Sequence, residues 1–206
     1  MNQPVSTTRT TEGIFGRLNG RRGHFLLESG YHADLWFDLD SLFVDPAALA
    51  PQVGALAALL SPYDVSAICG PLLGGAFLAQ AIAANLGVRF YYCEPQQTGS
   101  SSHLFSAQYR LPPGLFSDVG NQRVAVVDDA ISAGSSVRAV VAELISAGAM
   151  PVVVGSLLVL GTRATEHFSA TGIPVVAVES QTFRTWPPDE CPLCRQGDAL
   201  EQPSLR

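Results

Sequence analysis

The stretch VAVVDDAISAGSSV, residues 124–137, decides the fold of this chain. An apolar run rich in valine, typical of a buried strand, leads into the acids Asp128 and Asp129, and Ser135 and Ser136 then open a helix. Ligands of open α/β sheets bind at the edge where strands end and helices begin. The stretch therefore predicts a strand, a turn and a helix, with a ligand site between them.

The turn between the acids and the helix is suited to hold a phosphate. Small side chains let the backbone come close to a ligand, while the N–H groups of a helix N-terminus and neighbouring hydroxyls can donate to an anion. Two adjacent carboxylates repel each other unless a cation or a polyhydroxyl group bridges them, as ribose or hydrated Mg²⁺ can do. An ordinary strand-to-helix turn with a solvated acid as its cap is the simpler alternative. The residues concerned are Asp128, Asp129, Ala130, Ile131, Ser132, Ala133, Gly134, Ser135 and Ser136.

Strand-like and helix-like segments alternate on both sides of this stretch. We expect buried strands from apolar runs rich in β-branched residues, and helices from Ala-rich runs that have Pro or Ser near the start and Gly after the end. This alternation predicts an α/β fold, a doubly wound parallel sheet of about five strands flanked by helices. The expected strands are Val65–Cys69, Val88–Cys93, Arg123–Val127, Val152–Leu160 and Val175–Val178, and the expected helices are Pro46–Leu60, Gly75–Leu86 and Ser136–Ala147.

Three segments lie outside this alternation. We expect residues 1–45 to form a small N-terminal cap, or hood, on an α/β core at 46–185, and residues 186–206 to form an irregular tail, all within a single domain over 1–206. Residues 94–118 are rich in Ser, Gly, Pro and Gln and predict a long flexible loop. Connections of this length are usually functional or disordered.

The composition and net charge exclude several classes of mechanism and of binding partner. The 206 residues contain no lysine, because all twelve side chains counted as Lys+Arg are arginines, so a Schiff base and a phosphate-gripping lysine are excluded within the chain. The net charge of −6 argues against nucleic acid as a partner, since binding its backbone needs clustered cations. No apolar run approaches the roughly 18 residues of a membrane span, and the polar N-terminus lacks a signal-peptide core. We therefore expect a cytoplasmic protein with no membrane partner.

The segment DDAISAGSSVR resembles the phosphoribosyl-diphosphate (PRPP) motif of the type I phosphoribosyltransferases, and it is most similar to the orotate-type version. The resemblance implies Mg²⁺-dependent transfer of a phosphoribosyl group from PRPP to a nitrogenous base, with orotate as the expected acceptor and diphosphate as the leaving group. It also implies that residues 132–136 hold the 5′-phosphate, while Asp128 and Asp129 face the ribose hydroxyls and, through water, Mg²⁺.

Three further segments resemble parts of this family, in the same order along the chain. ICGPLLGG resembles its diphosphate-binding loop, GHFLLESG its base-site segment, and LLVLGTRATE the strand and loop whose arginine pairs with the orotate carboxylate. A glycine turn before a helix, ordinary core aromatics and a solvated arginine are the simpler alternatives. The resemblance assigns diphosphate binding to Gly70, Pro71, Leu72, Leu73, Gly74 and Gly75, and base binding to Phe25, Ser29, Gly30 and Arg163.

The chain departs from the family where cations would meet the leaving diphosphate. Tyr92 and Cys93 stand where Arg and Lys are expected, and Glu28 replaces a lysine. His103 and Arg110, in the long loop, are the candidates to take over this catalytic role. The resemblance also implies a homodimer, which supplies no lysine either. A non-catalytic PRPP or nucleotide sensor therefore stays open, as does a phosphoribosyltransferase for a purine-type acceptor, because Glu28, Tyr31 and His32 can shape a different base site.

The motif CPLC, from Cys191 to Cys194, is half of a zinc knuckle. A tetrahedral zinc site needs four ligands, and the missing ones can come from His167, from His103 or from the same cysteine pair of a partner chain. Unmetallated thiols and a labile disulfide are the alternatives. If Zn²⁺ binds here, we expect a structural role for it.

Overall fold

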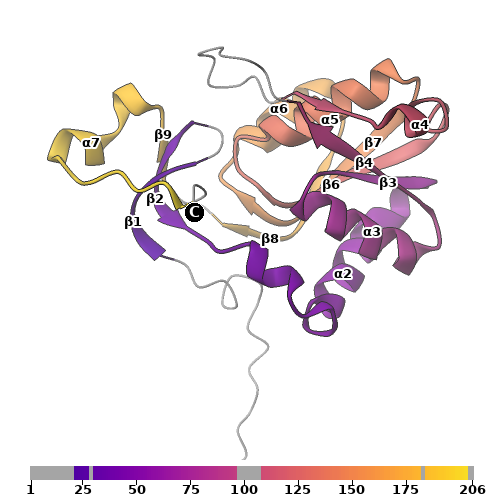
Figure 1. The fold of residues 1–206 in the computed structure, drawn as a ribbon, viewed down its shortest axis with the longest axis horizontal. Helices are drawn as coiled ribbons and strands as arrows, with labels where there is room; N and C mark the ends of the chain where they lie inside the picture. The colour runs from indigo at the N-terminus through magenta and orange to yellow at the C-terminus, as the bar shows by residue number, and fades with distance from the viewer. Residues whose placement is uncertain (1–20, 28–29, 97–107, 182–183, 204–206) are drawn as a thin grey trace, which may run out of the picture.

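The computed structural model describes residues 21–27, 30–96, 108–181 and 184–203. These residues form a core built on a six-stranded sheet and, beside it, a smaller three-stranded sheet (Figure 1). We call the smaller part the hood. It consists of β1 (Arg21–Leu26), β2 (His32–Trp36) and β9 (Thr185–Trp186), together with the short helices η3 (Pro188–Glu190) and α7 (Pro192–Gln196).

The core sheet has the strand order β5-β4-β3-β6-β7-β8. The five strands β4, β3, β6, β7 and β8 run parallel to one another, which confirms the predicted parallel sheet of about five strands. A short sixth strand, β5, pairs antiparallel with β4 at one edge. The bounds are β3 Ala67–Pro71, β4 Arg89–Pro95, β5 Tyr109–Arg110, β6 Arg123–Ile131, β7 Met150–Leu160 and β8 Val175–Gln181.

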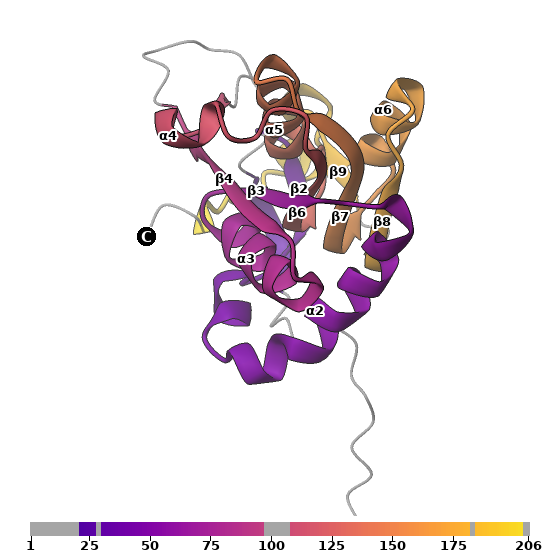
Figure 2. The ribbon, with the colours of Figure 1, turned by 90° about the vertical axis from the view of Figure 1, so that its right-hand side faces the viewer.

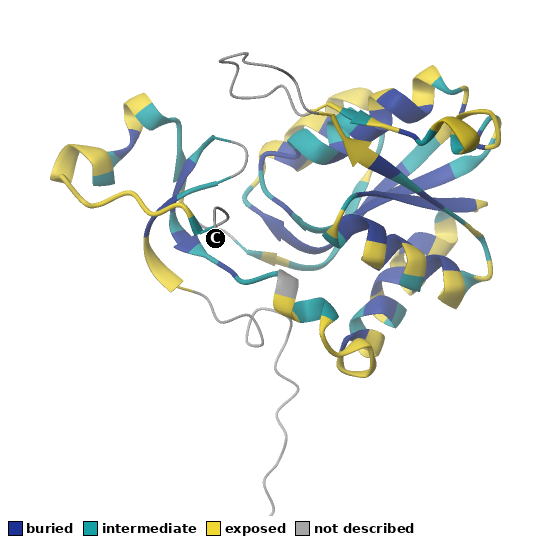
Figure 3. Cartoon of the chain, viewed as in Figure 1, coloured by how far each residue is buried: buried dark blue, intermediate teal, exposed yellow. Residues whose placement is uncertain are grey.

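Helices cover both faces of the core sheet (Figure 2). On β6, Ala125 and Val127 belong to the cluster shared with α2 and α3, while Val124 and Val126 belong to the cluster shared with α5 and α6. The strands are therefore apolar on both faces, and the sheet is the buried centre of the core (Figure 3). The four helices are α2 (Pro46–Leu60), α3 (Gly74–Leu86), α5 (Ser135–Ser146) and α6 (Arg163–Thr171).

Local chemistry explains where these helices begin. The Asp45 carboxylate accepts hydrogen bonds from the backbone N–H groups of Ala47 and Ala48 at 3.0 and 3.1 Å, and Pro46 occupies the first helical position of α2. The predicted bounds of α2 are confirmed. The helices α3 and α5 each begin one residue earlier than predicted, at Gly74 and Ser135.

The structure differs from the prediction in three segments. A helix that was not predicted, α6, follows β7. The tail was predicted to be irregular, yet it contains β9, η3 and α7 and packs against β1. Part of the predicted loop at 94–118 is regular, because β4 runs to Pro95 and both β5 and the short helix α4 (Pro113–Phe116) lie within it. Residues 97–107 of that loop lie outside the described residues.

The hood joins segments from both ends of the sequence. β2 pairs antiparallel with β1 and with β9. Phe25 and Glu201 form a bridge in which the Leu26 N–H donates to the Glu201 carbonyl at 2.9 Å and the Glu201 N–H donates to the His24 carbonyl at 2.8 Å. Two short 3₁₀ helices, η1 (Asp40–Phe43) and η2 (Ser61–Tyr63), flank α2 in the core. None of the helices in the described part of the chain has the length and apolar character needed to cross a membrane.

Candidate active site

Asp128 and Asp129 lie near the carboxyl end of β6, where they are half-buried. The Asp129 N–H donates to the Asp128 Oδ1 atom at 3.1 Å, and the Ala130 N–H donates to the Asp129 Oδ1 atom at 2.7 Å. From the neighbouring strand β7, the Ser156 hydroxyl donates to the Asp129 carbonyl at 3.1 Å. Both predicted acids are therefore held in place by backbone and side-chain hydrogen bonds.

The glycines at the start of α3 face these two acids. A Cβ atom added to Gly74 would collide with the Asp129 carboxylate, and one added to Gly75 would lie 2.8 Å from the Asp128 Oδ1 atom. A Cβ atom on Gly70 would collide with the backbone of Gly75. Side chains at these positions would displace the carboxylates or the loop. The structure thus brings together two motifs that the sequence separates by more than fifty residues.

The turn before α5 leaves helix N–H groups available at the same edge. Gly134 adopts the left-handed conformation, with φ of 76°, and caps a helix of 12 residues without a side chain that could accept from its first turn. Ser132, Ser135 and Ser136 are partly exposed, whereas Ile131 and Ala133 point into the core. The serine hydroxyls and the backbone can therefore meet an anion, while the side chains of Ile131 and Ala133 serve packing.

Arg138 is a cation beside this turn that the sequence motifs do not single out. The Nε atom of Arg138, in the first turn of α5, donates to the Gly134 carbonyl at 3.2 Å. The signal for it was the spacing of four residues after a glycine that precedes a helix, which places the arginine over the turn.

Arg163 connects the core to the hood. It is the first residue of α6, and its guanidinium carbon lies 4.0 Å from the centre of the Tyr31 ring, a cation–π distance. Tyr31 follows Gly30 in the turn between β1 and β2, where Gly30 has φ of 79°. A Cβ atom on Gly134 would lie 3.1 Å from the Cβ atom of Ala164, so the start of α6 also adjoins the turn before α5.

Phe25 and Ser29 are two further residues that the resemblance assigns to base binding. Phe25 is fully buried inside the hood and packs against Trp36, with the ring centres 6.5 Å apart. Its surroundings are those of a core side chain and not of a ligand-facing surface. Ser29 lies outside the described residues.

The predicted diphosphate loop is the connection from β3 to α3. Gly70 and Pro71 end β3 and are buried, Leu72 is half-buried, and the Leu72–Leu73 peptide bond is cis. The Leu72 N–H donates to the Cys93 carbonyl of β4 at 2.9 Å. Leu73 is 65% exposed, which leaves it accessible from outside the core.

Of the three positions that lack the expected cations, Glu28 lies outside the described residues, and packing groups occupy the other two, Tyr92 and Cys93. The Cys93 side chain is buried beside Cys69, with the two Sγ atoms 3.9 Å apart. The hydrogen bond with Cys93 and burial raise the pKa of the Cys69 thiol well above its usual range. Tyr92 stacks on Phe90, with ring centres 6.0 Å apart.

Of the two loop residues predicted to substitute for those cations, one is described. Arg110, on β5, forms a 2.6 Å ion pair with Glu143 of α5, whose side chain is 3% exposed. Glu143 also accepts a hydrogen bond from the Leu111 N–H at 3.1 Å. The guanidinium of Arg110 is thus engaged by a buried acid of the core. His103 lies outside the described residues.

A second cluster of functional groups lies in the hood. The donor atoms of His24, His32, Cys191 and Cys194 all lie within 4.8 Å of one another. His167, one of the ligands that the sequence offered to complete the site, is not among the residues of this cluster. It lies on α6 against the ring of Phe168, with ring centres 5.1 Å apart. The two histidines that join the cysteines are on β1 and β2 instead, and the other sequence candidate, His103, lies outside the described residues.

Comparison with known proteins agrees with this geometry. A family model described as the phosphoribosyl transferase domain matches residues 53–186, a range that contains the two acids, the glycine loop and Arg163. The hood cluster falls outside that range. The orotate phosphoribosyltransferase of Thermotoga maritima is 32% identical over 184 residues, covering 89% of this chain and 91% of that protein. The orotate phosphoribosyltransferase of Caldanaerobacter subterraneus is 29% identical over 194 residues, covering 94% of this chain and 95% of that protein.

Solved structures show the same fold. The crystal structure of orotate phosphoribosyltransferase from Aeropyrum pernix superposes with a TM-score of 0.63 at 25% identity, covering 78% of this chain and 87% of that one. Adenine phosphoribosyltransferase from Thermoanaerobacter pseudethanolicus superposes with a TM-score of 0.58 at 20% identity, covering 71% of this chain and 88% of that one. The second likeness concerns the fold alone.

Proposed function

Since the chain belongs to the phosphoribosyl transferase domain family, we propose that it transfers the 5-phosphoribosyl group of PRPP to orotate, giving orotidine 5′-phosphate and diphosphate. One observation carries the proposal. The acid pair Asp128–Asp129 lies directly against Gly74 and Gly75, next to a glycine-capped helix N-terminus. This arrangement offers acceptors for ribose hydroxyls between two sets of backbone donors for phosphate groups.

Each part of PRPP has a matching group in this arrangement. The first turn of α5 and the hydroxyls of Ser132, Ser135 and Ser136 suit the 5′-phosphate, because orphan helix N–H groups and hydroxyls donate to anions. The carboxylates of Asp128 and Asp129 suit the 2′- and 3′-hydroxyls of the ribose. The connection from Gly70 to Gly75 suits the diphosphate, because its glycines let the backbone approach closely.

A magnesium ion is the cofactor that the family implies, and the donor set fits it. Mg²⁺ prefers carboxylate oxygens and keeps several of its waters, and Asp128 and Asp129 are two adjacent, half-buried carboxylates. These two residues would hold the ion, partly through water. When bound, the ion supplies neutralisation of negative charge on the diphosphate.

Arg163 is the residue that supports orotate as the acceptor. A guanidinium fork matches a carboxylate in two parallel hydrogen bonds, and orotate carries a carboxylate whereas adenine and guanine do not. Arg163 stands between the hood turn at Tyr31 and the turn before α5, so a base beside the ribose would lie within its surroundings.

In the reaction, the bond from ribose C1′ to the diphosphate oxygen breaks with its electron pair going to diphosphate, and the orotate nitrogen forms the new bond to C1′. Backbone N–H groups near Gly74 and the helix N-terminus of α3 face the charge that builds on the leaving group. Loss of one charge-stabilising donor typically slows an enzyme by about 10²–10³-fold. With Cys93 buried and Arg110 paired, we expect slower turnover than a loop with the lysines that the resemblance implies would give.

The burial of Cys93 and the ion pair of Arg110 also favour a second candidate function. A protein that binds PRPP tightly, but whose described loop cation Arg110 is already paired with Glu143, can act as a non-catalytic PRPP sensor. It would bind PRPP with Mg²⁺ and release no diphosphate with any base. A purine-type acceptor is the third possibility, and it is separated from the first by the dependence on Arg163.

We also propose a homodimer. Leu73 and Phe77, at the start of α3, are 65% and 51% exposed, and the Phe77 ring lies 5.7 Å from that of Phe43 on η1. Exposed apolar side chains gathered in this way are typical of interaction surfaces. The surface borders the predicted diphosphate loop, so a second copy of the chain would cover the approach to the site.

The deciding experiment measures PRPP binding by calorimetry and diphosphate release with orotate, uracil, adenine and guanine. We expect Mg²⁺-dependent PRPP binding, and release with orotate only. The double variant Asp128→Asn/Asp129→Asn should lose PRPP affinity by about tenfold or more, because hydrogen bonds to charged acceptors contribute about 1.5–3 kcal/mol each.

Asp64→Asn is the matched control, since that acid is 97% exposed and has the left-handed conformation that Asn also tolerates. It should leave PRPP affinity unchanged. A wild-type protein that does not bind PRPP would contradict the assignment, whereas PRPP binding without diphosphate release would establish the sensor.

A further inference from the structure

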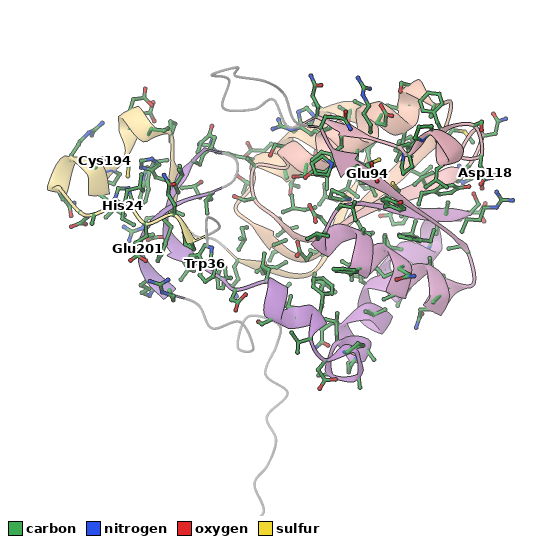
Figure 4. The ribbon with its side chains drawn as sticks, viewed as in Figure 1. His24, Trp36, Glu94, Asp118, Cys194 and Glu201 are labelled. Atoms are coloured by element: carbon green, nitrogen blue, oxygen red, sulfur yellow. The ribbon has the colours of Figure 1, made fainter. Side chains whose placement is uncertain are left out.

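The hood contains four soft or borderline metal ligands whose donor atoms face one another. His24 comes from β1 and Cys194 from α7, and both are labelled in Figure 4. His32 comes from β2, and Cys191 stands before the first residue of α7. The Cys191 Sγ atom lies 3.4 Å from the His24 Nε2 atom, and the Cys194 Sγ atom lies 3.3 Å from the His32 Nδ1 atom. The Cys194 Sγ atom is also 3.6 Å from the His24 Nε2 atom, and the two ring nitrogens are 2.9 Å apart.

These separations match those between the ligands of a tetrahedral zinc ion. With Zn–S near 2.3 Å and Zn–N near 2.05 Å, a regular tetrahedron puts nitrogen and sulfur ligands about 3.5 Å apart and two nitrogen ligands about 3.3 Å apart. The three nitrogen–sulfur distances given above lie between 3.3 and 3.6 Å, and the nitrogen–nitrogen distance of 2.9 Å is slightly shorter than that of the regular tetrahedron. Small side-chain movements would complete the coordination.

The surroundings orient the ligands as metal sites require. The Nδ1 atom of His24 lies 3.0 Å from the Asp198 carbonyl, so its N–H can donate there and leave the Nε2 lone pair turned toward the thiols. His24, His32 and Cys191 are 3%, 5% and 1% exposed, whereas Cys194 is exposed and leaves a route for an ion to enter.

We propose that His24, His32, Cys191 and Cys194 bind a structural Zn²⁺ ion that fastens the tail to the β1–β2 hairpin. Two thiolates and two imidazoles are a donor set that zinc favours, and the two negative charges neutralise the ion. Binding releases the two thiol protons and oxidises nothing. The four protein ligands fill all four positions of a tetrahedron, so the role is structural and no position remains for a catalytic water.

The site would act on a part of the molecule with little core of its own. The hood has three strands of six, five and two residues, and small elements of this size commonly need a disulfide or a metal. The turn that carries Gly30 and Tyr31 lies between the two histidines in the sequence, and Tyr31 touches Arg163. A zinc ion here would therefore fix the hairpin that reaches the proposed base site.

The test begins with metal analysis of wild-type protein purified without added metal and without chelator. We expect close to one zinc ion per chain, lost on treatment with a strong chelator and regained when Zn²⁺ is added. Loading the apoprotein with Co²⁺ should give the intense visible bands of tetrahedral cobalt together with thiolate-to-cobalt charge transfer. Removal of the metal should lower the melting temperature by at least about 5 °C, because a structural ion contributes directly to folding free energy.

Matched variants distinguish the proposed zinc ligands from the other cysteines and histidines of the chain. Cys191→Ser/Cys194→Ser should bind no zinc, whereas Cys69→Ser/Cys93→Ser, which removes the same number of thiols from the core sheet, should keep the full content. His32→Ala should lose the tetrahedral cobalt spectrum, and His167→Ala should not change it.

The proposal is overturned if the wild-type protein neither contains zinc nor takes up Co²⁺ in a tetrahedral site. It is equally overturned if thiol titration finds a Cys191–Cys194 disulfide in the purified protein, or if the Cys191→Ser/Cys194→Ser variant retains the metal. None of these outcomes depends on PRPP binding, so the zinc site and the proposed function are tested separately.

Discussion

Gly74 is the single residue on which the proposed PRPP site depends most closely. Its missing side chain leaves the space that the Asp129 carboxylate occupies. We expect Gly74→Ala to push that carboxylate away and to lower PRPP affinity by about tenfold or more, as for the loss of a charged hydrogen bond. Calorimetric titration with PRPP and Mg²⁺ measures this.

A second glycine provides the comparison. Gly54 lies inside α2, and a Cβ atom there meets nothing within 4 Å. Gly54→Ala should leave PRPP binding unchanged and stabilise the protein by about 0.5–1 kcal/mol, because alanine has the higher helix propensity. Equal PRPP affinities for the two variants would mean that Asp129 does not contact the ligand.

Arg163 carries the prediction about the acceptor. Arg163→Lys keeps a positive charge but loses the planar fork and much of the stacking on Tyr31. We expect the KM for orotate to rise by about tenfold or more while the Kd for PRPP stays constant. Steady-state kinetics with orotate, together with calorimetry for PRPP, separate the two constants.

Arg89→Lys is the control for that variant, because Arg89 is the first residue of β4, at the end away from the carboxyl edge of the sheet, and pairs with the half-exposed Asp118. Asp118 is labelled in Figure 4. It should change neither constant. An unchanged KM in Arg163→Lys would remove the carboxylate assignment and favour a purine-type acceptor.

At the scale of elements, the strands were the most predictable part. β6 and β7 are buried on both faces, so their valine-rich runs stand out from the rest of the sequence. The helix α6 was missed because only Ala164 and Phe168 of its nine residues are buried, too few for a visible apolar period. The structured tail could not be predicted because its contacts, such as the bridge between Phe25 and Glu201, are with residues that lie far from it in the sequence.

The contact between β5 and α5 gives a prediction at this scale. Glu143 is nearly fully buried and accepts from the Leu111 N–H and from Arg110. We expect Glu143→Ala to destabilise the protein by about 1–3 kcal/mol, because a buried N–H loses its acceptor. Glu143→Gln keeps an acceptor and should be milder.

Urea denaturation measures both free energies of unfolding. Glu94→Ala is the control, since Glu94 is exposed on β4 and surface changes are usually within about 0.5 kcal/mol of wild type. If Glu143→Ala were as stable as Glu94→Ala, the ion pair with Arg110 would not anchor β5, and Arg110 would be free to act in catalysis.

At the scale of the whole molecule, the apolar surface on α3 predicts self-association. We expect wild-type protein to sediment at twice the chain mass of 21.8 kDa, and Phe77→Glu to shift it toward the monomer. Ile145→Glu replaces a comparably exposed residue of α5, on the other face of the sheet, and should leave the mass unchanged. A monomeric wild type would contradict the proposed dimer.

The hood is assembled from strands that are synthesised at very different times. β1 and β2 leave the ribosome early, but their partners β9 and Glu201 are made more than 140 residues later. Pairing over such a sequence separation is slow to form, and domains otherwise fold as they emerge. The core can therefore fold around its parallel sheet before the last strand of the hood, β9, has been synthesised. A ribosome that stops before residue 185 would release a chain with an intact core and an open hood, so the proposed base site would depend on completed translation.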